Sequence, residues 1–270
     1  MILVDNFSFL VLGTGDAFSA YNYSSSILVE SGGQSLLLDC PHPIRKILRE
    51  ASSAESHIID ISDISAILLT HLHADHVSGL EGFAFYSPFA LQRKTQLIAH
   101  PDILNGIWEN SLQVGMSQLL DAEDLKKRGK SLNMSEIRER GFLKSYHFDD
   151  FFEVTSLSWT EAVKFGVFSI ECRETIHHVP TTAFRIRVAD KMLAYSADTT
   201  YDPSLIEWLS KADVIIHETN YGTHTAYEKL ALLPEEIRAK MFLIHYPDDF
   251  KHEDSLIRPL IQGKRYSIRR

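Results

Sequence analysis

Three histidines and one aspartate lie within six consecutive positions of the chain, in the segment Thr70-His71-Leu72-His73-Ala74-Asp75-His76. The apolar run Ala66-Ile67-Leu68-Leu69 precedes them, so we expect a buried strand that ends where the polar side chains begin. Imidazole nitrogens and carboxylate oxygens are ligands of zinc and similar divalent ions. The segment therefore predicts part of a metal centre, against the alternative of an accidental group of exposed histidines.

Further histidines and an aspartate occur where other expected strands end. These candidate ligands are His177 or His178 ahead of Pro180, Asp198 after the run Met192–Tyr195, and His245 after Phe242-Leu243-Ile244. Active sites of α/β proteins usually form where loops at the ends of strands converge. If these loops meet the His71–His76 segment at one edge of the sheets, the side chains suffice to bind two metal ions.

The elements that must position these side chains are short strands separated by turns and helices. Runs rich in β-branched and aromatic residues predict strands at Phe7–Leu12, Ser26–Val29, Leu36–Asp39, Ala66–Thr70, Gln96–Ala99, Gly166–Cys172, Ala183–Val188, Met192–Tyr195, Val214–His217 and Phe242–His245. Helical periodicity predicts helices at Ile44–Ala51, Leu205–Lys211 and Tyr227–Lys240, the last interrupted by Pro234. This order favours an α/β architecture in which two sheets are covered by helices.

The composition is that of an ordinary globular chain. Of its 270 residues, 44% are hydrophobic and 23% charged, so the chain can bury a core and disorder is not the default. The formal net charge of −9 argues against broad binding to nucleic acid or to an anionic membrane. No apolar run reaches the roughly 18 residues of a membrane-spanning helix, and the first residues predict a strand rather than a signal peptide. Two cysteines, Cys40 and Cys172, are too few for a disulfide framework, which favours a cytoplasmic location.

The segment from about residue 103 to residue 146 differs from the rest of the chain. It is polar and helix-prone, and both signs of charge are frequent in Asp121–Lys130 and Met134–Arg140. We expect a single domain over residues 1–270 with this segment as a helical insertion on its rim. The insertion would act as a lid over the site or as a contact in a homodimer.

The chain resembles the metallo-β-lactamase superfamily, and within it the branch of ribonuclease Z and related phosphodiesterases. The likeness rests on the His71–His76 motif with Val77-Ser78-Gly79-Leu80, and on segments along most of the chain: Leu12-Gly13-Thr14-Gly15, Leu38-Asp39-Cys40, His177-His178-Val179-Pro180, Ser196-Ala197-Asp198-Thr199, Ile216-His217-Glu218 and His245. This set is specific for the fold and much less specific for the substrate. The resemblance implies a four-layer αββα sandwich of two mixed β-sheets flanked by helices.

The resemblance also implies a centre of two divalent metal ions. The first ion would be bound by His71, His73 and His177, the second by Asp75, His76 and His245, and both by Asp198. His177 is favoured over His178 because it lies three residues before Pro180. Five histidines and two aspartates suit zinc best, with manganese or iron as alternatives. Asp39 matches a family position that supports the metal loop, where a carboxylate accepts the second N–H of a ligand histidine.

The chemistry implied by such a centre is hydrolysis. Two divalent ions about 3.5–4 Å apart can hold a bridging hydroxide that attacks phosphorus. A proton donor assists an alkoxide leaving group. The resemblance gives this role to His224, with a histidine at the start of the next helix as the alternative interpretation. Glu218 is expected to orient His224 or His245. Asp75 is expected to be a catalytic residue as well as a metal ligand.

One departure from ribonuclease Z narrows the range of expected substrates. The long basic arm with which those enzymes grip tRNA would lie between His177 and Asp198, where this chain has room only for two expected strands and a turn. Together with the net charge of −9, this favours a phosphodiesterase acting on a small or cyclic nucleotide-like phosphodiester. The alternatives are a ribonuclease Z-like RNA endonuclease without the arm, a lactonase or other ester hydrolase, and a metal-free binding protein. The last alternative is disfavoured because all seven ligand positions are filled.

Aromatic residues cluster after the histidine motif. The candidates are Phe83, Phe85, Tyr86, Phe89 and Trp108. They are suited to wall a substrate pocket and stack against a base, although packing in the core is the commoner role of such residues.

Overall fold

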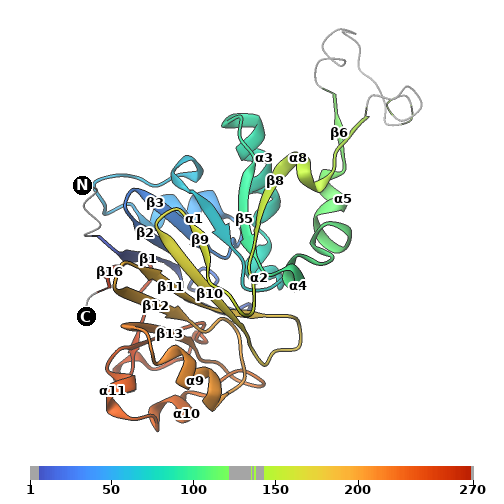
Figure 1. Cartoon of the computed structure of the whole chain (residues 1–270). Coiled ribbons are helices and arrows are strands. Elements are labelled where there is room, and N and C mark those ends of the chain that lie inside the picture. Colours follow the sequence, from blue (N-terminus) through green and yellow to red (C-terminus); the bar gives the residue numbers. More distant parts are fainter. Residues whose placement is uncertain (1–5, 122–134, 136, 138–142, 269–270) are drawn as a thin grey trace.

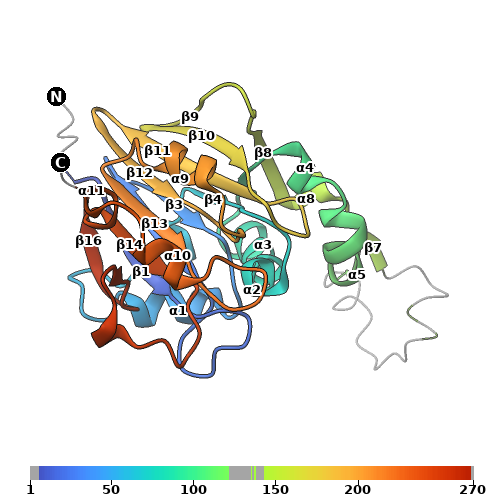
Figure 2. The ribbon, with the colours of Figure 1, turned by 90° about the horizontal axis from the view of Figure 1, so that it is seen from below.

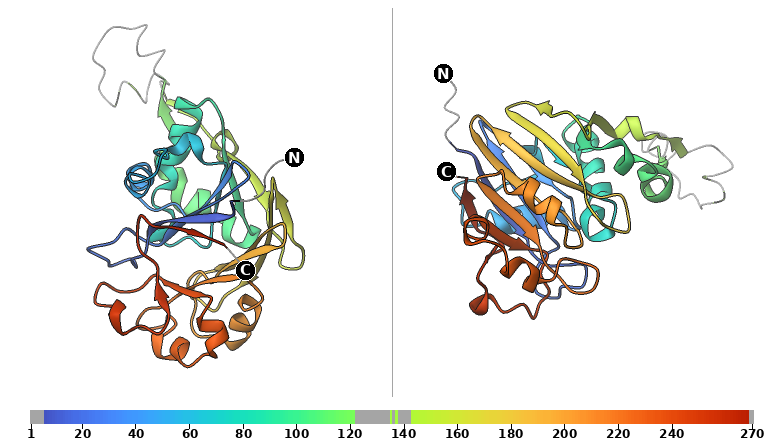
Figure 3. Two further views of the ribbon diagram at one scale, coloured as in Figure 1. Left: turned by 90° about the vertical axis from the view of Figure 1, so that its left-hand side faces the viewer. Right: turned by 60° about the horizontal axis from the view of Figure 1, so that its bottom comes forward.

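The computed structural model describes residues 6–121, 135, 137 and 143–268. Two seven-stranded sheets pack face to face, and helices cover the outer face of each sheet (Figures 1 and 3). This arrangement confirms the four-layer αββα sandwich predicted from the sequence. Within the described ranges, no helix is long and apolar enough to cross a membrane.

The first sheet combines an antiparallel meander with a parallel group of strands. Its order is β16 (Arg265–Ser267), β1 (Ser8–Gly13), β2 (Ser26–Ser31), β3 (Gln34–Leu38), β4 (Ala66–Leu68), β5 (Thr95–Ala99) and β8 (Phe152–Ser156). Strand β1 is antiparallel to β16 and β2, and β2 is antiparallel to β3. From β3 onward, β4, β5 and β8 each pair in parallel with the preceding strand.

The second sheet has the same division. Its order is β15 (Arg258–Pro259), β14 (Met241–Ile244), β13 (Val214–Glu218), β12 (Lys191–Tyr195), β11 (Thr182–Val188), β10 (Phe168–Glu174) and β9 (Val163–Phe165). Strands β9 to β12 are antiparallel neighbours, whereas β12 to β15 are parallel. The hairpin of β11 and β12 fills most of the space between His177 and Asp198, as predicted, so no long arm lies there.

Helices fill the two outer layers (Figure 2). They are α1 (Ile44–Ala51), α2 (Ala74–Val77), α3 (Leu80–Ala90), α4 (Pro101–Leu104), α5 (Gln113–Met116), α8 (Phe148–Phe151), α9 (Pro203–Leu209), α10 (Tyr227–Ala231) and α11 (Glu235–Arg238), with short 3₁₀ turns η1 (Ile61–Asp63) and η3 (His252–Asp254) and a π-helical turn η2 (Trp108–Leu112). Buried residues of α1 and α3 pack against the first sheet, and those of α9 and α10 against the second.

Alternation along the strands divides the buried side chains between layers. Phe9 and Val11 of β1 join the core between the two sheets, together with Ile216 of β13. Leu10 and Leu12, which point to the other face of the same strand, pack in the cluster that contains α1 and α3. Each such buried side chain contributes about 1.5–3 kcal/mol relative to an exposed one. The packing of both faces of β1 fixes its register, and with it the position of the loop that follows.

All ten strands predicted from the sequence are present, with shifts of a few residues at their ends. The expected strand Ala66–Thr70 ends at Leu68, because the Thr70 N–H donates to the Asp39 carboxylate at 2.8 Å instead of to a neighbouring strand. The expected helix Tyr227–Lys240 is two helices, α10 and α11, separated at Pro234. The short outer strands β8, β9, β15 and β16 were not predicted, since they carry little hydrophobic pattern.

The insertion is only partly described. Its described ends contain η2, α5 and an antiparallel pair of strands, β6 (Gln118–Leu120) and β7 (Leu143–Ser145), which project beyond the first sheet (Figure 1). A two-stranded base therefore accompanies the expected helices. The charged stretches Asp121–Lys130 and Met134–Arg140 lie almost entirely outside the described residues, and the lid and dimer roles stay predictions.

Candidate metal centre

The seven predicted ligands meet at one edge of the sandwich. They come from four places in the fold: His71, His73, Asp75 and His76 from the loop after β4 and from α2, His177 from the loop between β10 and β11, Asp198 from the loop after β12, and His245 from the end of β14. The first sheet thus supplies four of these side chains and the second sheet three. Their nitrogen and oxygen atoms form groups within 4.8 Å.

His71, His73 and His177 form the first group together with Asp198. The Nδ1 atom of His73 lies 3.0 Å from Nε2 of His71 and 3.4 Å from Nε2 of His177. The Nε2 atom of His71 lies 3.7 Å from an Asp198 oxygen. Ligand atoms held about 2.0–2.1 Å from one zinc ion are roughly 3–3.4 Å apart, so this spacing suits a metal ion.

Asp75, His76 and His245 form the second group. An Asp75 oxygen lies 3.2 Å from Nε2 of His76 and 3.5 Å from Nε2 of His245. Asp198 approaches these imidazoles as well, with its Oδ1 atom 3.6 Å from His76 and its Oδ2 atom 3.6 Å from His245. The two oxygens of Asp198 therefore lie between both groups, as a bridging carboxylate requires.

Two buried imidazole nitrogens of the centre face carboxylates but make no hydrogen bond. His76 and His245 are 0% and 3% exposed, and the Nε2 atoms of both lack a hydrogen bond within the described part of the chain. A buried polar group without a partner costs about 1–3 kcal/mol. Coordination to a metal ion would remove this cost, so the donor set fits metal binding better than it fits a structure without metal.

Asp39 orients two of the imidazoles. One carboxylate oxygen lies 2.8 Å from Nδ1 of His76, so this nitrogen carries the proton and leaves the Nε2 lone pair free for a metal. The Thr70 hydroxyl donates to Asp39 and lies 2.8 Å from Nδ1 of His71, which places the His71 proton on Nδ1 in the same way. The contact to His76 is the one expected of Asp39 from the sequence.

Backbone hydrogen bonds hold the histidine motif against this carboxylate. The Cys40 N–H donates to the His76 carbonyl at 2.7 Å, and the Gly79 N–H donates to the Cys40 carbonyl at 2.8 Å. A Cβ atom at Gly79 would lie 2.4 Å from the carbonyl oxygen of Pro41. Only glycine permits this close approach, which explains its place in the motif.

His178 takes a different position from His177. Its Nε2 atom lies 2.9 Å from Nε2 of His73, on the side of the ring away from the Nδ1 atom that faces the other ligands. The geometry thus favours His177 as the ligand, and His178 as the acceptor for the outer N–H of His73.

Three residues beside the centre have left-handed backbone conformations. Their φ angles are 60° at Asp39, 53° at Ala197 and 58° at His245. Each costs of order 1–3 kcal/mol for a residue with a Cβ atom, and such conformations cluster at functional sites. Each marks a sharp turn after a strand, so the chain is strained at the points where the ligand loops begin.

Glu218 and His224 form a pair beside the ligands. The buried Glu218 Oε1 atom accepts the Thr199 N–H at 2.8 Å and lies 3.0 Å from Nδ1 of His224. Burial raises the pKa of Glu218, and the hydrogen bond to Glu218 raises the pKa of His224. The His224 ring packs 5.2 Å from the His245 ring. The structure thus pairs Glu218 with His224 rather than with His245.

The electrostatics of the centre favour bound cations. Burial lowers the pKa of His177 to about 4, so this imidazole is neutral near pH 7, the form in which histidine binds metal. Burial opposes protonation of His245 too, but Asp198 and Asp75 outweigh it and raise the pKa of His245 to about 8. The buried carboxylates therefore stabilise positive charge, a role that metal ions fit.

The centre lies in a cavity of about 790 Å³, which we call the metal-centre cavity. His73, Asp75, Asp198 and His245 contribute to its lining together with His178 and His224. Its other lining residues are Asp16, Ala17, Phe18, Ser19, Ala74, Asn220, Tyr221, Gly222, Pro247, Asp248 and Asp249. Five carboxylates line it, and among the described residues no lysine or arginine does.

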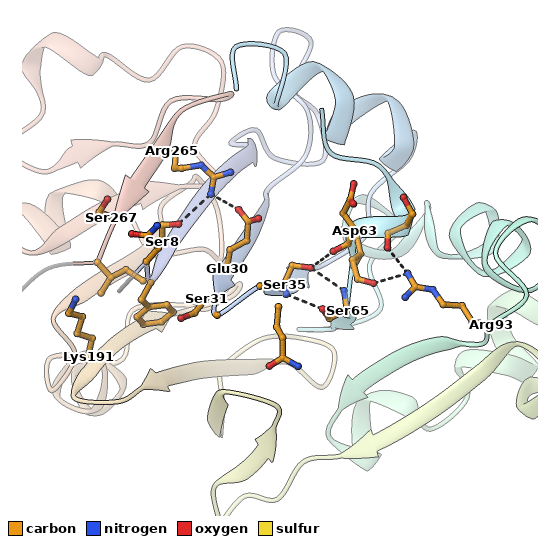
Figure 4. Close-up of a pocket in the computed structure, with 18 residues that line it drawn as sticks. Ser8, Glu30, Ser31, Ser35, Asp63, Ser65, Arg93, Lys191, Arg265 and Ser267 are labelled. Carbon is orange, nitrogen blue, oxygen red and sulfur yellow. Dashed lines mark hydrogen bonds and ion pairs between the residues drawn. The ribbon is translucent and has the colours of Figure 1, made fainter. Parts of the chain in front are cut away.

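A second cavity of about 780 Å³, which we call the distal cavity, lies where β1, β3, β4 and β12 begin, at the edge of the sandwich opposite the ends of β4, β12 and β14. Figure 4 shows its lining residues. Both of its arginines have partners within the protein. Arg265 pairs with Glu30 and Glu55, and the Arg93 guanidinium donates to the carbonyls of Ile61, Ser62 and Ile64. The two cavities have nearly the same volume. They differ in whether their polar lining groups have partners within the protein.

The aromatic residues that line the metal-centre cavity were not predicted. None of Phe83, Phe85, Tyr86, Phe89 and Trp108 lines it; Phe83 is buried, and Phe85, Tyr86 and Trp108 pack against the same core. Phe89 is exposed elsewhere. Phe18 and Tyr221 occupy the rim instead. The available signal was the position of Phe18 in the loop directly after the turn Gly13-Thr14-Gly15, because active-site residues concentrate in such loops.

Comparison with known proteins agrees with this geometry. Residues 7–259 match the family model described as anti-Pycsar protein Apyc1. An anti-Pycsar protein Apyc1 of Bacillus phage BSP38 is 30% identical, over 96% of this chain and 97% of its own length.

Solved structures agree on the fold. YhfI of Bacillus subtilis, a metallo-β-lactamase fold protein, has a TM-score of 0.68 and 20% identity, with 97% of this chain and 99% of YhfI covered. The short form of human tRNase Z has a TM-score of 0.64 and 16% identity, with 97% of this chain and 99% of the human chain covered. These likenesses confirm the predicted metallo-β-lactamase fold.

Proposed function

The chain belongs to the family described as anti-Pycsar protein Apyc1, and on this premise we propose that it is a metal-dependent phosphodiesterase acting on a small nucleotide phosphodiester, with cyclic nucleotides as the preferred class. One observation carries the proposal: two groups of metal-binding side chains share Asp198 in the lining of one cavity. We extend to this chain the anti-Pycsar role that the name of its relatives states.

The residues fit the hydrolysis of a phosphodiester. When bound, two divalent ions would lower the pKa of water near the scissile group and offset the charge of the phosphoryl oxygens. Asp198 would hold the two positions at a fixed separation, since its Oδ2 atom lies 3.7 Å from His71 of the first group and its Oδ1 atom lies 3.6 Å from His76 of the second. Asp75 lies close to the Nε2 atoms of both His76 and His245, so the three side chains would bind the same ion. Zinc is the metal we propose first, with manganese and iron as alternatives.

His224 is the proposed proton donor. Glu218 binds its Nδ1 atom, which leaves Nε2 free to give a proton to the leaving oxygen. The hydrogen bond to Glu218 raises the pKa of His224, so a larger fraction is protonated near neutral pH than for an unpaired histidine. General-acid assistance of this kind is typically worth about 10²–10⁴-fold in rate.

The cavity favours a small substrate over RNA. A polynucleotide presents many phosphates, and its affinity depends on lysine and arginine contacts to them. The described lining has no lysine or arginine and includes Asp16, Asp248 and Asp249 outside the two metal groups. The net charge of −9 adds further repulsion. A small substrate has only one phosphate, and the metal ions would offset its charge at the point of cleavage. Such a substrate therefore avoids most of the electrostatic repulsion.

The test combines metal analysis with three substrate classes. We expect about two zinc or manganese ions per purified chain, turnover of bis(p-nitrophenyl) phosphate, and faster turnover of a 3′,5′-cyclic nucleotide than of an RNA oligonucleotide or a lactone. His73→Ala should lose metal and turnover together. His57→Ala, which changes an exposed histidine that pairs with Asp63 away from the centre, is the matched control and should keep both.

Other outcomes decide between the alternatives. Faster cleavage of RNA would favour the ribonuclease Z-like endonuclease, and metal with lactone turnover alone would favour an ester hydrolase. A pure protein without metal and without turnover, even after zinc or manganese is added, would favour a metal-free binding protein. The homodimer and the cytoplasmic location stay predictions; both cysteines are buried and free, which is compatible with a reducing compartment.

A further inference from the structure

Phe18 lines the metal-centre cavity although 91% of it is exposed. Single exposed apolar side chains are common on protein surfaces and need no explanation by themselves. This one differs because it lies at the mouth of the cavity that also contains Asp75 and Asp198. A ring held in water beside a reaction centre is available to a substrate that enters the cavity.

The loop that carries Phe18 is fixed in place. At its base, the Gly15 N–H donates to the Tyr23 carbonyl at 3.0 Å. Near its tip, the Ser19 hydroxyl and the Ala20 N–H both donate to the Asp248 carboxylate, the second at 2.7 Å. Asp248 lies three residues after the ligand His245. The loop is therefore tied to the same segment that carries a metal ligand.

Asp16 gives the loop a second attachment. Its Oδ1 atom accepts the Phe18 N–H at 2.8 Å, and its Oδ2 atom accepts a hydrogen bond from the Asn220 side chain at 2.8 Å. The same Asn220 amide donates to the His245 carbonyl at 3.1 Å. The backbone of Phe18 is thus held on both sides while its ring is free. Such preorganisation lowers the entropy lost on binding, as expected of a residue that contacts a ligand.

Tyr221 completes the rim next to Asn220. It is 66% exposed, and its hydroxyl donates to Asp249 at 3.0 Å. The polar groups near Phe18 and Tyr221 therefore already have hydrogen-bond partners within the protein. The rim offers a flat apolar group and carboxylates, which suit a flat uncharged ring system and repel a second anionic group.

We propose that Phe18 is the platform on which the base of a nucleotide substrate stacks while its phosphate lies at the metal centre. The proposal rests on the proposed function and deepens it, because it assigns the non-reacting part of the substrate to a particular side chain. Stacking of a base on an aromatic side chain is typically worth roughly 5- to 100-fold in affinity when that side chain is changed to alanine. The same platform accepts any base, since every base presents a π face.

The test measures binding and turnover separately on the metal-loaded protein. Titration calorimetry compares adenosine 5′-monophosphate with ribose 5-phosphate, which lacks the base. We expect Phe18→Ala to weaken the nucleotide by roughly 5- to 100-fold and to leave ribose 5-phosphate unchanged. Phe18→Trp should restore nucleotide affinity. In turnover of a 3′,5′-cyclic nucleotide, Phe18→Ala should raise KM by a similar factor with little change in kcat.

Tyr21→Ala is the matched control, because Tyr21 is an aromatic residue of the same loop, is 83% exposed and does not line the cavity. It should leave both ligands unaffected. Equal losses for the nucleotide and for ribose 5-phosphate in Phe18→Ala would overturn the proposal, as would unchanged binding of both. The proposed function fails separately, if the wild-type protein does not hydrolyse cyclic nucleotides; the ratio of the two binding constants still decides the role of Phe18.

Discussion

The metal-centre cavity and the distal cavity lie at opposite edges of the same sandwich and have nearly the same volume, about 790 and 780 Å³. In the distal cavity, Arg265 is neutralised by Glu30 and Glu55, and the Ser35 hydroxyl donates to the Asp63 carbonyl at 2.7 Å. In the metal-centre cavity, carboxylates and imidazoles converge without a lysine or arginine among the described lining residues. The arginines and carboxylates of the distal cavity largely bind one another or the backbone. The carboxylates and imidazoles of the metal-centre cavity converge without such arginine partners in the described part of the chain.

This difference identifies function better than volume does. Ser31 Oγ is the one buried side-chain atom of the distal lining without a hydrogen bond in the described residues, whereas at the metal centre the Nε2 atoms of both His76 and His245 face carboxylates without a hydrogen bond. Buried polar groups in folded proteins are nearly always hydrogen-bonded, so a group of exceptions needs an explanation. At the metal-centre edge, coordination to a metal ion would supply the missing partners.

Asp198→Ala should have the largest effect. It removes the carboxylate shared by both groups and leaves the facing imidazoles without their counter-charge. We expect turnover to be abolished and metal content to fall below one ion per chain, measured by elemental analysis and by hydrolysis of bis(p-nitrophenyl) phosphate. Full turnover in this variant would contradict the proposed centre.

His224→Gln should slow catalysis by about 10²–10⁴-fold on a substrate with an alkoxide leaving group. The metal ligands are unchanged, so metal content should stay at the wild-type level. The loss should be much smaller for bis(p-nitrophenyl) phosphate, whose leaving group departs without a proton. Equal losses in kcat on both substrates would show that His224 does not act as the proton donor.

Asp39→Asn should lower metal affinity by about 10–100-fold, the usual effect of changing a partner of a ligand histidine. The amide keeps the size of the side chain, but only one of its two polar atoms is an acceptor. It cannot accept both the Thr70 N–H, which bonds one carboxylate oxygen, and the Thr70 hydroxyl and Nδ1 of His76, which bond the other. Competition with a chelator measures the affinity. Unchanged affinity would mean that the backbone alone fixes the orientation of His76.

Arg265→Gln should have the smallest effect on activity and a measurable effect on stability. It breaks the balanced network of the distal cavity, and we expect the free energy of unfolding to fall by about 1–2 kcal/mol, because the pair is partly exposed. Urea unfolding measures this, with Lys191→Gln in the same cavity as control. A loss of turnover at saturating metal would contradict the conclusion that the distal cavity contributes to stability and not to activity.

Much of the fold was predictable because strands buried on both faces carry a strong hydrophobic signal. Strand β1 is buried at every residue, and so is β14. The outer strand β7 has no buried residue and was missed. The candidate ligands could be named from the sequence because the histidine motif is local and because Asp198 and His245 follow expected strands. The family resemblance added only their division between two ions.

The rim of the site was not predictable in the same way. Phe18 acquires its position from a contact between Asp16 and Asn220, which are 204 residues apart in sequence. No local pattern encodes a contact at that separation. The choice between His177 and His178 likewise depends on which ring faces Nδ1 of His73, a matter of a few ångströms.

Each group of ligands draws on both sheets. His71 and His73 follow a strand of the first sheet and meet His177 from the second, while Asp75 and His76 meet His245. An ion at either position would therefore act as a cross-link between the two halves of the sandwich. Unfolding would have to release both ions before the sheets separate, so the lifetime of the native protein would depend on the free metal concentration of its surroundings.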